Sequence, residues 1–371
     1  MDLTLTEDQR LIQSTARELL DSRAAAACAR AVGDDPAGYS ARLWKEIVEL
    51  GWTGLAIPEE HGGVGEGFGE LCLVLEELGR SRVPAPLAAT AACCGMPILR
   101  HGTEAQRAEW LGAIARGQVM SYVAGDDGDR GDGGGGGGGV VAERSGDGFV
   151  LDGEASFVPY ADAASRLLVT GRDRDGPIAA VVDADAPGIA REPLDVIADP
   201  AHRVRFDHVA VPGARVLGGI PGDASAVAAI TAYGTAAVCA EMVGGAQGVL
   251  DMTVAYARER EQFGQPIGAF QAVAHHCADM ATDVLASRFI AYEAIWRLAD
   301  GRDATEELSL AKSWVSDAYQ RVCALGHQVH GAIGFTAEHD LHYFTRHAMA
   351  SALAFGDADF HTERVAAHLG I

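Results

Sequence analysis

The stretch Tyr256-Ala-Arg-Glu-Arg-Glu-Gln-Phe-Gly-Gln-Pro-Ile-Gly-Ala-Phe-Gln-Ala-Val-Ala-His275 joins two long helical patterns. The first pattern ends at Arg258 and Arg260, Phe263-Gly264 predicts a turn, and Phe270 begins the second pattern. A guanidinium suits a pyrophosphate, and an aromatic ring suits the face of an adenine. The stretch therefore predicts a helical corner that displays both groups, although an ordinary helical hairpin with a surface arginine would have the same pattern.

A second stretch, Gln328-Val-His-Gly-Ala-Ile-Gly-Phe335, interrupts a helical run with Gly331 and Gly334. Small residues at such a point permit a ligand to approach the backbone closely. An interhelical turn without a ligand would also use these glycines. The two stretches together make a ligand site worth testing.

Around these stretches the periodicity changes twice. Residues 1–118 are predicted to be helical, with a capping box at Thr6 and Gln9, a helix ending at Gly51 and another closed by Gly79. Residues 119–222 contain short runs typical of strands, at 149–151, 167–170, 178–182, 204–206 and 209–211. Residues 223–371 return to long helices, at 224–260, 270–299, 306–325 and 340–354.

This order of blocks predicts three segregated domains rather than alternating strands and helices. They are an N-terminal helical domain (1–118), a small β domain (119–222) and a C-terminal helical bundle (223–371). The glycine-rich segment 125–139 within the β domain is expected to be a mobile loop, because glycine loses the most conformational entropy on ordering.

Composition excludes several classes of protein. The chain has 371 residues and a formal net charge of −23, which argues against nucleic-acid binding. Its N-terminus has no signal-peptide pattern, and no run of about 18 apolar residues predicts a membrane span. Its seven cysteines show neither CxxC nor disulfide-like spacing, so a reduced, cytoplasmic protein is expected.

The sequence patterns of dinucleotide-binding and metal-binding sites do not fit this chain. The glycines at 63, 65, 67 and 69 do not fit the dinucleotide-binding pattern, and four glutamates flank them. The histidine pairs 275/276, 327/330 and 339/342 have no cysteine or carboxylate at metal-ligand spacing, so no metal site is predicted.

Four motifs make the sequence resemble the acyl-CoA dehydrogenase family over nearly its whole length. They are Thr4-Leu-Thr-Glu-Asp-Gln9, the segment from Leu43 to Gly63 with Leu-Gly-Trp52 and Ile57-Pro-Glu-Glu-His-Gly-Gly63, Val74-Leu-Glu-Glu-Leu-Gly79, and Arg260-Glu-Gln-Phe-Gly264 with Pro266-Ile-Gly268. The resemblance implies a mainly α fold with a small central β domain, barrel-like or a sandwich, and a C-terminal four-helix bundle. It also implies FAD at a subunit interface, with the ADP half held by the neighbouring chain's helical domain.

The resemblance assigns a set of cofactor residues to this chain. Those that would hold the pyrophosphate and adenine of a neighbour's FAD are Arg260, Gln262 and Phe263, with Gln328, Gly331 and Ala332 lining the same site. Ala332 replaces a usual glycine. In the β domain, Phe157 would keep the aromatic contact to the flavin.

The catalytic base of the family is missing at both of its known positions. The usual glutamate position falls on Phe355, and the alternative position falls on Gly234. Neither side chain can accept a proton from the α-carbon of an acyl-CoA. Asp357 is a weak candidate for a base of different geometry, but Asp357 and Asp359 would disfavour a flavin cofactor nearby.

The β domain departs from the family as well. A stretch rich in aspartate and glycine (124–139) replaces the segment that hydrogen-bonds the flavin, and Phe157-Val-Pro-Tyr160 replaces another. Pro159 has no backbone N–H to donate. The elements that would serve the chain's own flavin are lost, while those that would serve a neighbour's are kept.

The sequence therefore predicts a non-catalytic subunit of a heteromeric acyl-CoA dehydrogenase, as an α2β2 hetero-oligomer or another dimer or tetramer with a catalytic subunit. It resembles the two-chain enzymes that act on sterol side-chain CoA thioesters in actinobacteria. Three alternatives remain: a self-sufficient homotetrameric dehydrogenase with a non-standard base, a flavin monooxygenase or nitroalkane-oxidase-like enzyme, and a cofactor-free structural or binding protein.

Overall fold

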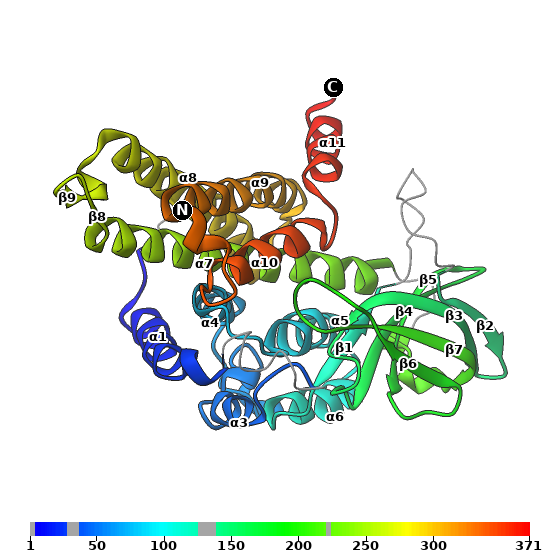
Figure 1. Cartoon of the computed structure of the whole chain (residues 1–371). Coiled ribbons are helices and arrows are strands. Elements are labelled where there is room, and N and C mark those ends of the chain that lie inside the picture. The colour runs from blue at the N-terminus through cyan, green and yellow to red at the C-terminus, as the bar shows by residue number, and fades with distance from the viewer. Residues whose placement is uncertain (1–3, 28–36, 125–138, 220–223) are drawn as a thin grey trace. The chain divides into compact units, whose positions relative to one another are not determined.

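The computed structural model describes residues 4–27, 37–124, 139–219 and 224–371, which form two compact units (Figure 1). One unit combines Met1–Gly33, Gly69–Pro84 and Thr235–Ile371, and the other combines Asp34–Phe68 and Ala85–Gly234. We call them the helical unit and the sheet unit.

The helical unit contains long helices drawn from both ends of the chain. Its elements are α1 (Glu7–Ala27), most of α4 (Phe68–Ser81) and of α7 (Ala224–Glu259), the strands β8 (Glu261–Gln262) and β9 (Gln265–Pro266), η6 (Ile267–Ala269), α8 (Gln271–Ala299), α9 (Thr305–His330), η7 (Gly331–Phe335), α10 (Leu341–Leu353) and α11 (Ala358–Leu369).

Local signals in the sequence explain most of these boundaries. The predicted capping box is confirmed, because Thr6 N donates to Gln9 Oε1 (3.0 Å) and Gln9 N donates to Thr6 Oγ1 (3.2 Å). The predicted helix end at Gly79 is wrong, since α4 continues to Ser81. A Cβ on Gly79 would lie 2.0 Å from the carbonyl oxygen of Glu241 on α7, so this glycine serves close helix packing instead of a cap.

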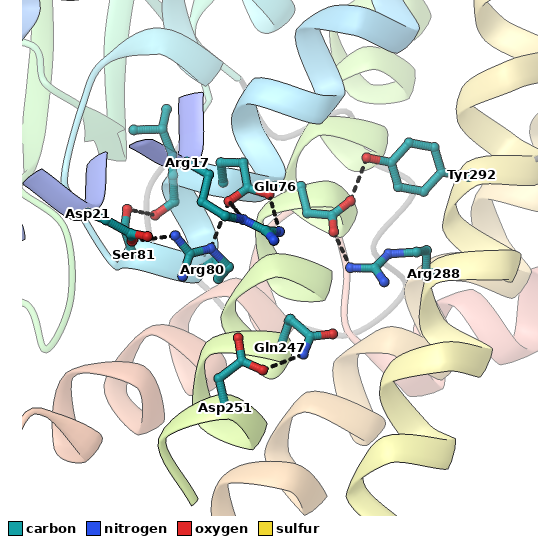
Figure 2. Close-up of polar contacts among 11 residues, drawn as sticks. Arg17, Asp21, Glu76, Arg80, Ser81, Gln247, Asp251, Arg288 and Tyr292 are labelled. Atoms are coloured by element: carbon teal, nitrogen blue, oxygen red, sulfur yellow. Dashed lines mark hydrogen bonds and ion pairs between the residues drawn. The ribbon is translucent and has the colours of Figure 1, made fainter. Parts of the chain in front are cut away.

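Two adjacent buried glutamates attach α4 to its neighbours (Figure 2). Glu76 accepts hydrogen bonds from Arg288 and from the Tyr292 hydroxyl (2.6 Å), both on α8. Glu77 accepts from Arg17 on α1 (2.7 Å) and from Arg80 (2.7 Å). Because buried charges are tolerated only when they are paired, these contacts fix α1 and α8 against α4.

The sheet unit holds short helices and one large sheet. Its elements are α3 (Ala41–Glu49), η1 (Trp52–Gly54), η2 (Glu59–His61), η3 (Ala88–Gly95), α5 (Met96–His101), α6 (Glu104–Ala115), β1 (Met120–Val123), β2 (Val141–Ser145), β3 (Gly148–Pro159), β4 (Arg166–Asp173), β5 (Gly176–Asp183), β6 (Ile189–Pro193), β7 (Ala201–Val211), η4 (Gly213–Arg215) and η5 (Leu217–Gly219), followed by the first residues of α7.

The sheet has seven strands in the order β1-β4-β2-β3-β7-β6, with β5 also paired to β4. The two runs predicted at 204–206 and 209–211 belong to the single strand β7. A buried cluster that includes Trp110, Leu111, Met120 and Leu168 packs α6 against the sheet. The predicted mainly α fold with a central β domain is confirmed.

Two further predictions can be compared with the structure. Segment 125–138 of the predicted mobile loop lies outside the described residues. The prediction that no segment reaches the length and hydropathy of a membrane span is wrong by composition, because α7 reaches both. However, 72% of its most apolar window is buried inside the protein, as in a core helix. The boundaries of the three predicted domains stay a prediction.

Candidate functional site

The hairpin between α7 and α8 presents the predicted cofactor residues to solvent. Its base is closed by Arg260 N donating to Tyr256 O (2.8 Å) and Ile267 N donating to Arg260 O (2.8 Å). At its tip, Phe263 and Gly264 have φ angles of 55° and 82°, so the predicted turn is confirmed. Phe263 is 94% exposed and touches Phe270 edge-on, with ring centroids 6.1 Å apart.

This turn is strained at Phe263, although packing within the hairpin does not require a phenylalanine there. A bulky residue with positive φ is an outlier that costs about 1–2 kcal/mol, and glycine or asparagine would fit better. Such strain is commonly retained where a side chain has a function. Arg260 and Gln262 are also exposed beside Phe263, so the hairpin displays a cation, an amide and a ring together.

The second predicted stretch lies at the end of α9. Gln328 is exposed on the last turn of the helix, and Gly331 follows with φ 64° and ψ −142°, a conformation open to glycine. Ala332 is exposed in η7. A Cβ on Gly331 would meet nothing within 4 Å, so backbone conformation rather than crowding requires glycine there.

An aromatic stack brings the two stretches together. Tyr256 at the end of α7 lies on the ring of His330 at the end of α9, with centroids 4.6 Å apart and planes at 22°. His330 Nδ1 lies 2.8 Å from the acceptor Gly326 O, and its ring contacts that of His339 (4.7 Å). Burial and the neighbouring imidazoles hold the pKa of His330 below its ordinary value, so the ring is neutral at pH 7.

Because the His330 imidazole is neutral, the positive charge beside the turn comes from Arg260, which is exposed at the base of the hairpin. The sequence interpretation considered the histidines only as metal ligands and missed their stacking role. The signal that could have shown it is the spacing of His327 and His330, which places both rings on one side of the last turn of α9.

Phe355, which the sequence resemblance assigns to the usual position of the catalytic base, lies in a loop held from two sides. Phe355 and Gly356 have φ angles of 58° and 99°. The buried Lys312 on α9 donates to Ala352 O (2.8 Å), Gly356 O (2.9 Å) and Ser316 Oγ (3.0 Å). Burial lowers the pKa of this amine to about 8.

From the other side, His361 Nε2 donates to Phe355 O (3.0 Å), and burial lowers the pKa of this imidazole to about 4. Asp357, the weak candidate base, accepts from Phe360 N (2.8 Å) and caps α11. The sequence interpretation missed Lys312 and His361, although Lys312 is one of only two lysines in the chain.

Gly234, which the sequence resemblance assigns to the alternative base position, is buried within α7. In the sheet unit its neighbour Tyr233 accepts from Arg100 Nε (3.1 Å) and touches Phe68 edge-on, with centroids 4.8 Å apart. The structure therefore adds a phenol, but no carboxylate, at this point of the helix.

Phe157 lies in the sheet unit and is 71% exposed. It has φ 61° and sits where the register between β3 and β7 shifts, between Ala155 and Val158. A bulge of this kind redirects a side chain away from the sheet. Pro159, two residues later, has no backbone N–H to donate. Its carbonyl instead accepts a hydrogen bond from the Ser121 hydroxyl.

One group of three among the described residues has metal-ligating atoms within 4.8 Å of one another, namely Asp152, Asp207 and His208. His208 Nδ1 lies 3.0 Å from Asp207 Oδ1 and 3.1 Å from Asp152 Oδ1, and these carboxylates raise its pKa. Ion pairing between His208 and the two carboxylates accounts for this grouping without a metal.

Comparisons with known proteins cover the whole chain. Residues 6–118 match the family model of the acyl-CoA dehydrogenase N-terminal domain, and residues 225–370 match that of the C-terminal domain. The probable acyl-CoA dehydrogenase YngJ of Bacillus subtilis is 29% identical, over 97% of this chain and 97% of its own length.

Solved structures agree with these matches. A chain of the Tcur3481-Tcur3483 steroid ACAD is 32% identical with a TM-score of 0.89, and the comparison covers 99% of each chain. A chain of the ChsE4-ChsE5 complex from Mycobacterium tuberculosis is 27% identical with a TM-score of 0.91, covering 100% of this chain and 99% of that one. With matching family models at both ends and a similar fold throughout, this chain belongs to the acyl-CoA dehydrogenase family, whose members bind FAD.

Proposed function

We propose that this chain is the non-catalytic subunit of a heteromeric, FAD-dependent acyl-CoA dehydrogenase, and that it holds the ADP half of a cofactor whose flavin lies in a partner chain. The observation that carries the proposal is Phe263, which is 94% exposed on a strained turn. A ring held in this way gains free energy only when something covers it.

The exposed groups around the hairpin fit an adenosine diphosphate moiety. Arg260 can donate to the pyrophosphate, Gln262 can donate an amide hydrogen bond, and Phe263 offers its face to the adenine. At the end of α9, Gln328 offers a side-chain amide. Gly331 and Ala332 have no side chain or a small one, so a ligand can approach the backbone there. A bound FAD would supply the acceptor for the hydride that leaves the β-carbon of the acyl group.

The chain's own base position supports the non-catalytic part of the proposal. Dehydrogenation needs a carboxylate near the α-carbon, because that C–H is a weak acid. Phe355 and Gly234 supply none, and Asp357 is committed to the cap of α11. The partner would supply the carboxylate, the flavin-binding β domain and the acyl-CoA pocket.

The likeness to chains of a steroid ACAD supports a bulky, steroid-type acyl-CoA as the substrate of the complex. We further propose a cytoplasmic location. In the described part of the chain six cysteines are free thiols, as expected in a reducing compartment.

The visible absorption spectrum tests the proposal. The chain purified alone should carry no stoichiometric flavin. Co-expressed with an acyl-CoA dehydrogenase chain that carries the catalytic glutamate, the complex should carry one FAD per pair of chains and oxidise acyl-CoA. Arg260→Ala should weaken FAD binding about 10- to 100-fold, the loss expected for a charged hydrogen bond.

Arg203→Ala, which removes another exposed arginine, should leave FAD binding unchanged. A stoichiometric flavin with turnover in the chain alone would favour a self-sufficient enzyme with a non-standard base. A complex that forms without FAD would favour a structural subunit.

A further inference from the structure

Four histidines lie together where α9 ends and α10 begins. We call them the imidazole cluster, and its members are His327 and His330 on α9, His339 between η7 and α10, and His342 on α10. The rings of His330 and His339 meet edge-on, with centroids 4.7 Å apart. Two other aromatic rings cover the cluster. Tyr256 from α7 stacks on His330, and Phe335 from η7 stacks on His327 with centroids 4.4 Å apart.

Hydrogen bonds determine which nitrogen carries the proton in each neutral ring of α9. A carbonyl only accepts, so His330 Nδ1 carries the hydrogen that it donates to Gly326 O (2.8 Å). The Thr345 hydroxyl donates to Leu341 O (3.3 Å), so His327 Nε2 carries the hydrogen of its bond with that hydroxyl (2.8 Å). The other two nitrogens, His330 Nε2 and His327 Nδ1, are therefore acceptors. Both are buried, and neither has a hydrogen-bond partner within the described part of the chain.

Among the described residues, no carboxylate acts on these two rings. The charged groups that act on His330 are His339 and His327, and those that act on His327 are His339 and His342. From α7 the neighbour is the ring of Tyr256, η7 has no titratable side chain, and no described group of α8 acts on either ring. Burial and repulsion between imidazoles keep the pKa of both rings below its ordinary value. A proton on either ring therefore lacks a partner of opposite charge in the free chain.

The cluster adjoins the residues that the proposed function assigns to the ADP half of the cofactor. His327 and His330 flank Gln328 on the last turn of α9. Tyr256, which stacks on His330, also accepts the main-chain hydrogen bond from Arg260 at the base of the hairpin (2.8 Å). A diphosphate held by Arg260 and Gln328 would bring negative charge to these imidazoles. Because a nearby anion favours the charged form of an imidazole, the anion and the proton strengthen each other's binding.

We propose that the imidazole cluster takes up a proton, on His330 Nε2 or His327 Nδ1, when the diphosphate of the cofactor binds at the end of α9. The site then holds this anion more tightly in mildly acidic solution. The inference rests on the proposed function, because that function places the diphosphate beside Gln328. If Arg260 alone supplied the positive charge, binding would not depend on pH in this range, since a guanidinium stays charged throughout.

The affinity of the heteromer for FAD, measured by equilibrium dialysis, tests the inference. It should rise about 5-fold between pH 7.5 and 6.0, because uptake of one proton changes the affinity by at most about 10-fold per pH unit. Calorimetry of FAD binding in two buffers with different heats of ionisation counts the protons taken up. The double variant His327→Gln/His330→Gln should lose both effects. The matched control is His368→Gln on α11, which removes an exposed histidine paired with Glu306 and should keep them.

A second measurement needs neither the partner nor a substitution. In nuclear magnetic resonance titrations of the unaltered full chain, inorganic pyrophosphate should raise the pKa of two histidines. The same two signals should be missing from the double variant. This measurement tests the anion site even where the heteromer binds no FAD.

Each result decides between the inference and the proposed function. FAD affinity that is constant with pH overturns the inference and leaves the proposed function standing. A pH dependence that persists in the double variant overturns it as well. A heteromer that binds no FAD at any pH refutes the proposed function, and the pyrophosphate titration then decides whether the cluster is a proton-linked anion site. Proton uptake that is lost in the double variant and kept in His368→Gln supports both.

Discussion

The hairpin at Phe263 and the loop at Phe355 both bend the chain through a phenylalanine with a left-handed backbone, and they differ in what holds that backbone. At the hairpin, main-chain hydrogen bonds close only the base, and the ring at the tip is exposed. At the loop, Lys312 on α9 and His361 on α11 donate to three carbonyls, those of Ala352, Phe355 and Gly356.

The difference separates an exposed strained turn, which the proposed function places against a ligand, from a strained turn held by buried side chains. Strain persists only where surrounding interactions offset it. The buried side chains of Lys312 and His361 offset it at Phe355, so we expect that loop to keep its conformation when the side chain of residue 355 is changed. Little offsets it at Phe263 within the helical unit, so the offset is expected from a bound molecule.

The largest expected effect comes from removing Lys312. Together with His361, this residue holds the loop at Phe355, and we call the two side chains the lock. Lys312→Ala removes three hydrogen bonds and leaves a buried gap, so the free energy of unfolding should fall by about 3 kcal/mol in urea titration. The control is Lys45→Ala, the other lysine of the chain, whose exposed ion pair with Glu49 should contribute less than about 0.5 kcal/mol. Equal effects of the two substitutions would show that the loop does not depend on Lys312.

The lock should also respond to pH. The pKa of His361 is about 4 in the folded chain, below the ordinary 6.5, so the unfolded chain binds the proton more tightly. Stability is therefore full above pH 6.5 and is lost as the pH falls towards 4, by on the order of 2–3 kcal/mol.

Unfolding midpoints between pH 7.5 and 4.5 check this dependence. His361→Gln should flatten it. Part should remain, because the pKa values of His327 and His330 are lowered as well. An unchanged slope in His361→Gln would contradict the assignment.

The hairpin could be predicted from the sequence, whereas the lock could not. Phe263-Gly264 between two helical patterns is a local turn signal, and the structure confirms the turn. The lock joins Lys312 to carbonyls some 40 residues later in the chain, and no local pattern encodes such a contact. Lysine is rare in this chain, which makes Lys312 conspicuous in the sequence, but its rarity does not indicate which carbonyls it contacts.

Gly79 shows the same limit of prediction from a local sequence pattern. Gly79 looks like a helix cap in the sequence, because glycine commonly ends helices. In the structure it lies within α4 against the backbone of α7, a contact between segments far apart in sequence. A glycine signals an unusual backbone or a close approach, and only the tertiary structure tells which.

At the hairpin the expected effects concern binding rather than stability. Phe263→Ala removes the exposed ring, and FAD affinity of the heteromer should fall about 10-fold, as for loss of one aromatic stack on a base. Equilibrium dialysis of FAD against the heteromer measures it. Phe335→Ala, which removes the 72% exposed ring of η7 that stacks on His327, is the comparison, and a larger loss there would move the adenine site to η7.

The smallest effect measures the strain itself. Alanine and glycine at position 263 both lack the ring, but only glycine accepts φ 55° without a steric cost. Phe263→Gly should therefore be about 1 kcal/mol more stable than Phe263→Ala in urea titration. The two variants should bind FAD equally weakly. Equal stability would mean that the turn relaxes to a negative φ in solution, and the contrast between a ligand-facing strained turn and a locked one would then be lost.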